Sequence, residues 1–100
     1  MNINICKSLE EVRNNIDHID QQIVSLIARR GTYVKQAAKF KNNEAEVQAP
    51  NRVSQVITKV RNLSLELGAN PDIVEKVYRE MINGFIKEEM AEHSRSTDQT

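Results

Sequence analysis

The stretch from Ser8 to Lys41 constrains the fold more than any other part of this sequence. Its apolar residues alternate three and four apart, as in a coiled-coil seam: Leu9, Val12, Ile16, Ile19, Ile23 and Leu26. The repeat continues through position 30 to Tyr33, Ala37 and Phe40. Ser8 and Glu11 have the spacing of a capping box, and neither Gly nor Pro occurs before Gly31. The pattern predicts one helix from Leu9 to about Lys41.

The length and composition favour a small soluble domain that needs a partner. A single domain is expected over residues 1–100, with residues 1–7 and 94–100 frayed. A helix of roughly 30 residues cannot bury its apolar stripe alone, so we expect an oligomer. The 14 basic and 14 acidic residues balance, which disfavours nucleic acid or an anionic membrane as partner. The single Cys6 and the lack of an export signal or membrane span indicate the cytoplasm.

The rest of the chain predicts two further helices and no strand. The second begins at Pro50 and closes at Gly68, with its apolar face at Val53, Val56, Ile57, Val60, Leu63 and Leu67. Asn70 and Pro71 open the third helix, on which Glu89 lies close to the apolar stripe. Residues 42–49 are polar and lack a period, which predicts a loop that could act as a lid. The fold class is therefore all-α, with three helices.

Three cations lie on or beside the apolar stripe of the first helix. Arg30 occupies a seam position, while Arg13 and Lys41 flank the seam. On a continuous helix, Arg30 and Lys41 are about 16 Å apart and only ~20° apart around the axis, so they could converge on one small anion. Arg13 is about 25 Å from Arg30 along the helix and can reach the same ligand only from a second, antiparallel chain.

These cations indicate a pocket for a dianion. Arg52, in the first turn of the second helix, is a candidate fourth member, with surface placement as its alternative. Arg30 taken alone could instead be an ion-pair partner within the protein. The sequence offers no recognisable nucleophile–base pair, metal cluster or Gly-rich phosphate loop, so we expect neither a metal nor a cofactor.

Two segments give the chain a family resemblance. Residues 29–41, RRGTYVKQAAKFK, and residues 49–53, APNRV, resemble the all-helical chorismate mutases, and within them the isochorismate pyruvate-lyases. The resemblance implies an intertwined homodimer with two shared sites. In each site, Arg13 of one chain and Arg30 of the other would bind the substrate carboxylates, and Lys41 would contact the ether oxygen. Arg52 matches a motif arginine of the family.

Glu89 departs from the family pattern, because the position that hydrogen-bonds the ether oxygen is often Gln. A carboxyl group can donate that hydrogen bond only when it is protonated. The resemblance nevertheless places Glu89 beside Lys41 as a catalytic residue.

The activity that the resemblance implies is a cofactor-free pericyclic reaction of a small dicarboxylate. Isochorismate would give salicylate and pyruvate, with chorismate rearranging to prephenate in the same site. A chain that is primarily a chorismate mutase is the first alternative. The second is a non-catalytic homodimer that serves as an interaction module, in which Arg30 pairs with Glu88 or Glu89 across the core.

Overall fold

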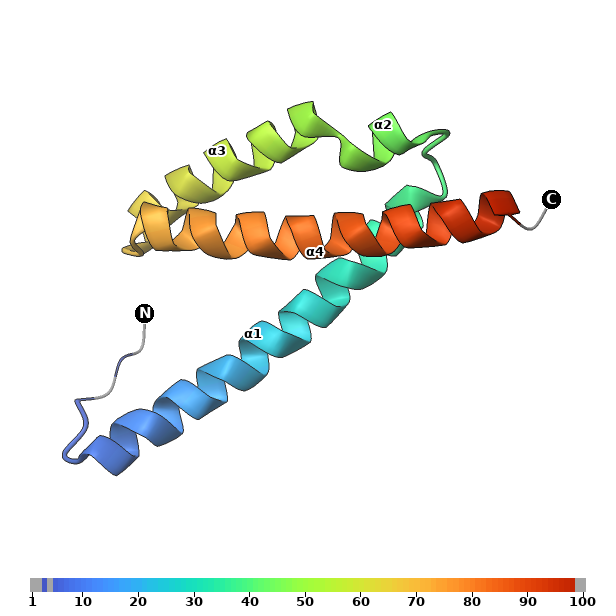
Figure 1. The fold of residues 1–100 in the computed structure, drawn as a ribbon. Helices are drawn as coiled ribbons and strands as arrows, with labels where there is room; N and C mark the ends of the chain where they lie inside the picture. The colour runs from blue at the N-terminus through green and yellow to red at the C-terminus, as the bar shows by residue number, and fades with distance from the viewer. Residues whose placement is uncertain (1–2, 4, 99–100) are drawn as a thin grey trace. The chain divides into compact units, whose positions relative to one another are not determined.

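The computed structural model describes residue 3 and residues 5–98, with side chains through residue 94. The described chain contains α1 (Leu9–Ala38), α2 (Glu44–Gln48), α3 (Pro50–Leu67) and α4 (Pro71–Asp98), and no strand (Figure 1). The prediction of an all-α protomer with three long helices, the longest at the N-terminus, is confirmed. The chain divides into two compact units, Met1–Tyr33 and Val34–Thr100, and the boundary falls within the sequence of α1. The single domain stays a prediction.

The N-terminus of α1 is capped by the side chains that the sequence pattern indicates. Ser8 Oγ accepts a hydrogen bond of 3.1 Å from the Glu11 N–H. The Glu11 carboxylate reaches back to the N–H of Lys7, at 2.9 Å, one residue earlier than the usual reciprocal bond. Residues 3, 5 and 6 have no regular secondary structure, as expected for the start of the chain; residues 1, 2 and 4 lie outside the described residues.

The C-terminus of α1 comes three residues earlier than predicted. The N–H groups of residues 39–41 donate to the carbonyls of residues 36–38, at 3.0–3.2 Å. These are bonds between residues three apart, which tighten a helix end into a 3₁₀-like turn. The α-helix therefore ends at Ala38, and Lys41 follows the turn.

The apolar stripe of α1 is exposed in the single chain. Its side chains retain between 40% and 68% of their accessible surface: Leu9, Val12, Ile16, Ile19, Ile23, Leu26 and Tyr33. A contiguous apolar stripe of this length is unusual on a monomer's surface.

Residues 42–49, predicted to be a loop, contain the short helix α2 from Glu44 to Gln48. Asn43 caps α2, because its Oδ1 accepts a 2.9 Å hydrogen bond from the Glu46 N–H. Val47 is buried at 3% exposure, and α2 packs on α4. Ala49 ends α2 in the left-handed region (φ 41°, ψ 58°). The Asn43–Glu46 spacing is itself that of a capping box, a local signal that the loop interpretation overlooked.

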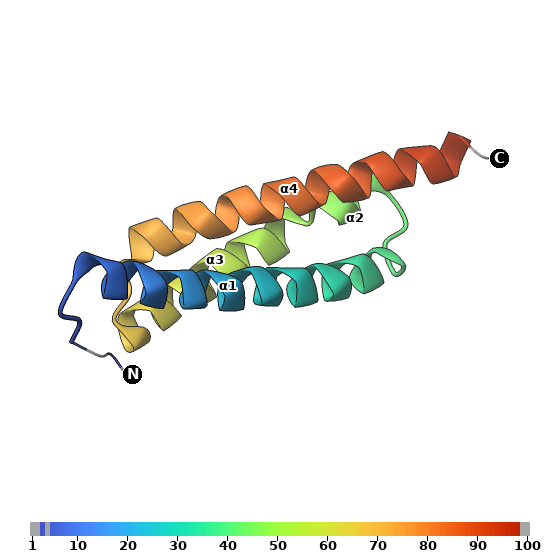
Figure 2. The ribbon, with the colours of Figure 1, turned by 90° about the horizontal axis from the view of Figure 1, so that it is seen from below.

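Helices α3 and α4 form an antiparallel hairpin that holds the core of the second unit. Both views show the two helices side by side (Figures 1 and 2). Gly68 closes α3 with φ 77°, and Asn70 Oδ1 caps α4 by accepting from the Asp72 N–H at 2.9 Å. The buried core consists of Val56, Ile57, Val60 and Ile82.

The C-terminal part of α4 is longer than expected. The helix continues to Asp98, so the backbone of residues 94–98, expected to fray, is helical; residues 99 and 100 lie outside the described residues. Extending an existing helix needs no new nucleus, which allows a polar sequence to remain helical. None of the helices in the described chain combines the length and apolar character needed to cross a membrane.

Candidate active site

An ion pair joins two of the predicted site residues. Lys41 Nζ donates to Glu89 Oε2 at 3.1 Å. Lys41 lies after the turn that ends α1, and Glu89 lies on α4, 48 residues further along the chain. Only the packing of the second unit brings these two groups together.

Glu89 is the only charged side chain that is buried among the described residues. It retains 6% of its accessible surface, whereas Lys41 retains 22%. Burying a carboxylate is costly unless a partner compensates its charge, and Lys41 is that partner. The Lys41 side chain thus contacts a buried acid and keeps part of its own surface exposed. Glu88, the neighbouring acid, is exposed.

The three arginines are on helices, as the sequence predicts. Arg13 is exposed on α1, Arg30 is half-buried on the same helix, and Arg52 is exposed in the first turn of α3. Arg13 and Arg30 are separated by about 25 Å of continuous α-helix, a span that two side chains cannot bridge. If both bind one ligand, one of them must come from a second chain. Their roles stay predictions.

Arg30 and Lys41 do not lie on one continuous α-helix, which corrects the prediction. Helix α1 ends at Ala38, and tighter turns follow before Lys41. The separation of about 16 Å along a helix therefore does not apply to this pair. Lys41 is placed by the turn after α1 and by its contact with Glu89.

A second ion-pair group joins α3 to the first turns of α4. Arg61 Nη1 lies 3.1 Å from Asp72 Oδ1 and 2.8 Å from Glu75 Oε1, and Arg79 Nε lies 2.7 Å from Glu75 Oε2. Hydrogen bonds from Arg79 and then Arg61 hold the pKa of Glu75 below its ordinary value. Hydrogen bonds to Asp72 and then Glu75 raise the pKa of Arg61. This group links α3 to α4.

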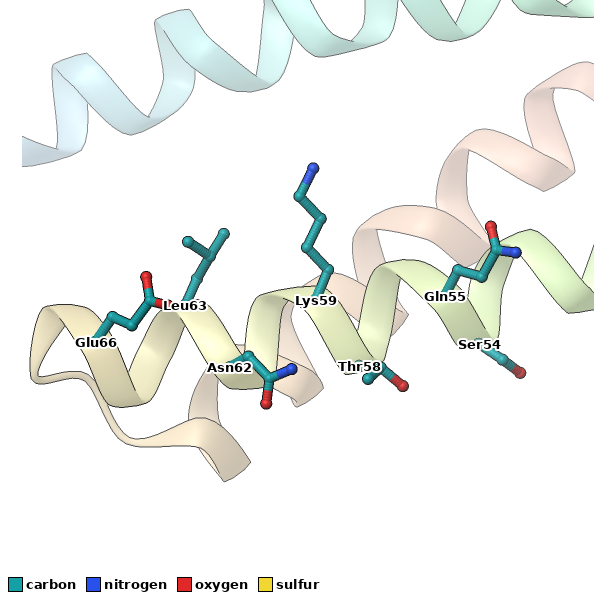
Figure 3. Close-up of a pocket in the computed structure, with 7 residues that line it drawn as sticks. All are labelled: Ser54, Gln55, Thr58, Lys59, Asn62, Leu63 and Glu66. Atoms are coloured by element: carbon teal, nitrogen blue, oxygen red, sulfur yellow. The ribbon is translucent and has the colours of Figure 1, made fainter.

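An open groove of about 610 Å³ runs along α3 and contains none of the predicted site residues. Figure 3 shows its lining, which includes Lys59, Leu63 and Glu66. Every lining residue comes from the same helix, so the groove has no opposing wall to enclose a ligand. We therefore place the candidate site at Lys41 and Glu89.

An all-helical chain with a cation paired to a buried acid is consistent with the resemblance found in the sequence. The chorismate mutase type II family matches residues 12–90, which include all five predicted site residues. The chain therefore belongs to this family of enzymes, and the predicted family is confirmed.

Two activities occur among the relatives that this chain resembles in sequence. The isochorismate pyruvate lyase of Pseudomonas aeruginosa is 35% identical over 85 residues, which cover 85% of this chain and 84% of the relative. The chorismate mutase of Methanocaldococcus jannaschii is 31% identical over 77 residues, covering 76% of this chain and 78% of that enzyme. The family thus includes relatives of both activities at similar levels of identity.

Proposed function

We propose that this chain is an isochorismate pyruvate-lyase that also rearranges chorismate to prephenate in the same site. The partly exposed side chain of Lys41, with its Nζ 3.1 Å from a carboxylate oxygen of the buried Glu89, is the observation that carries the proposal. Identity to the P. aeruginosa lyase and the segments 29–41 and 49–53 support the lyase reaction. The proposed compartment is the cytoplasm.

The proposed mechanism is pericyclic and needs no cofactor. The site would hold the enolpyruvyl ether in a reactive conformation, and Lys41 would stabilise the negative charge that grows on the ether oxygen as the C–O bond breaks. In the lyase reaction, a ring hydrogen moves to the enolpyruvyl methylene group while that bond breaks, releasing pyruvate and the aromatic salicylate. In the mutase reaction, a new C–C bond forms instead and gives prephenate.

Glu89 would assist at the same oxygen. The carboxyl group can donate a hydrogen bond to the ether only when protonated, whereas an amide donates at every pH. We therefore expect Glu89→Gln, which keeps a donor at this position, to remain active, and Glu89→Ala, which keeps none, to have a lower kcat. Equal kcat values for these two variants would mean that Glu89 does not face the ether oxygen.

The dicarboxylate would be held by residues of two chains. Arg13 of one protomer and Arg30 of its partner would each bind a carboxylate, with Arg52 as a further contact. The exposed apolar stripe of α1 supports a dimer, because a second chain could cover it. The length of helix between Arg13 and Arg30 supports sharing of the sites.

One assay of both substrates tests the activity. Purified protein is given isochorismate or chorismate, and salicylate and prephenate are followed separately. Salicylate formation supports the lyase, prephenate alone supports the mutase alternative, and no turnover of either refutes both. Lys41→Ala should lower kcat by about 10²- to 10³-fold, the usual loss for one preorganised donor. Lys35→Ala, which removes an exposed cation from the last turn of α1, is the matched control.

Mixed dimers test the sharing of sites. When Arg13→Ala and Arg30→Ala chains are combined, each heterodimer has one complete site and one site with both lesions. Random exchange should then restore about a quarter of wild-type activity. No recovery, with exchange verified, would place both arginines in the site of one chain. If the protein binds no cyclic dicarboxylate in titration calorimetry but remains dimeric, the interaction-module alternative is favoured.

A further inference from the structure

The backbone around Lys41 is held on both sides. The Lys41 N–H donates to the Ala38 carbonyl at 3.1 Å, which closes the last turn after α1. The next N–H, that of Asn42, donates to the carboxylate of Glu46. The Lys41 side chain is fixed separately by Glu89. Both peptide groups that flank the Lys41 Cα are therefore hydrogen-bonded.

Glu46 links the backbone next to Lys41 to α2, which packs on α4. It lies in α2, where its own N–H is bonded by the Asn43 side chain. The next residue, Val47, is buried as α2 packs on α4. Helix α4 also carries Glu89, which contacts the Lys41 side chain. The backbone next to Lys41, through α2, and the Lys41 side chain, through Glu89, are therefore both positioned by α4.

We propose that Glu46 is a positioning residue for Lys41, acting through the hydrogen bond from the Asn42 N–H. The proposal rests on the proposed function, in which Lys41 stabilises the transition state. Without this acceptor, the backbone N–H of Asn42 would donate to water instead, and the peptide group between Lys41 and Asn42 would be freer to rotate. The ammonium group would then occupy its productive position for less of the time.

The expected effect is on the chemical step. Because Lys41 is proposed to act on charge that develops in the transition state, losing its alignment should lower kcat and leave KM nearly unchanged. Glu46 and Asn42 are exposed, so water can replace part of the interaction. We therefore expect about a tenfold fall in kcat for Glu46→Ala, which corresponds to about 1.4 kcal/mol.

Two further variants at this position separate the hydrogen bond from the charge. Glu46→Gln keeps an acceptor oxygen at the same reach and should retain kcat within about twofold of wild type. Glu46→Asp keeps the charge but shortens the side chain by one methylene group, and should resemble Glu46→Ala. Glu44→Ala is the control, because it removes an exposed acid from the first turn of the same short helix and should leave kcat unchanged.

Hydrogen exchange of the Asn42 amide provides a readout that is independent of turnover. Exchange should accelerate about tenfold or more in Glu46→Ala and Glu46→Asp, and remain slow in Glu46→Gln and Glu44→Ala. Wild-type kcat in Glu46→Ala, or an unchanged Asn42 exchange rate, would overturn the proposal. So would a Glu46→Gln protein as slow as Glu46→Ala, or an equal loss in Glu44→Ala. Absence of turnover in the wild-type protein would overturn the proposed function and this role with it, whereas the other outcomes leave the proposed function standing.

Discussion

Removing the charge of Lys41 should destabilise the protein, because it leaves Glu89 buried without a cation. Glu89 is 6% exposed and Lys41 is 22% exposed. Breaking a buried ion pair by removing one partner costs about 3–5 kcal/mol, and the partial access of water to Lys41 places Lys41→Met near the lower value. For a chain of this size, about 3 kcal/mol corresponds to a fall in Tm of roughly 12–20 °C.

Removing the charge of Glu89 instead should destabilise the protein much less. Glu89→Gln keeps an acceptor oxygen, and the partly exposed ammonium group of Lys41 can remain hydrated. We expect a cost of about 1 kcal/mol or less. In the Lys41→Met/Glu89→Gln double variant no buried charge is left unpaired, so the destabilisation should be less than the sum of the two single effects by about 2 kcal/mol.

Chemical denaturation of the four proteins, at one fixed protein concentration, provides the four free energies of unfolding. The fixed concentration is necessary because association contributes to the measured stability of an oligomer. Equal and small effects of the two single substitutions, with no coupling in the double variant, would refute the buried ion pair. The same data show what fraction of each variant is folded, so that a lower kcat of a Lys41 variant can be separated from unfolding.

Three further predictions concern stability outside the proposed site. Arg79 and Arg61 lower the pKa of Glu75 in the folded chain, so the ionised carboxylate stabilises the fold at pH values above its unfolded pKa of 4.5. This contribution is lost as the pH falls through the lower pKa of the folded chain. Glu75→Gln should therefore show a smaller loss of Tm than wild type between about pH 5 and pH 3. Gly84 lies within α4 with open space where a Cβ would stand, so Gly84→Ala should raise the free energy of unfolding by about 0.5–1 kcal/mol in denaturant titrations; a loss instead would mean that a second chain packs against that face. Ala49 has a positive φ at the end of α2, so Ala49→Gly should stabilise the protein by up to about 1 kcal/mol, and a lower denaturation midpoint would contradict the left-handed backbone.

The sequence alone determined the long helices and most of their ends, because these depend on signals within a few residues. The apolar spacing defined α1, Pro50 and Gly68 bounded α3, and the Asn70 cap marked the beginning of α4. Two local features were missed. The turn after Ala38 ends α1 early, and the Asn43 cap makes α2 a helix.

Tertiary structure alone decided how the predicted site residues are combined. Lys41 and Glu89 are 48 residues apart, and no local pattern specifies which acid on α4 meets that cation. Packing within the second unit makes the choice, since Glu89 is buried there and Glu88 is exposed. Burial without a partner would be costly, so the fold that buries Glu89 also requires Lys41 beside it.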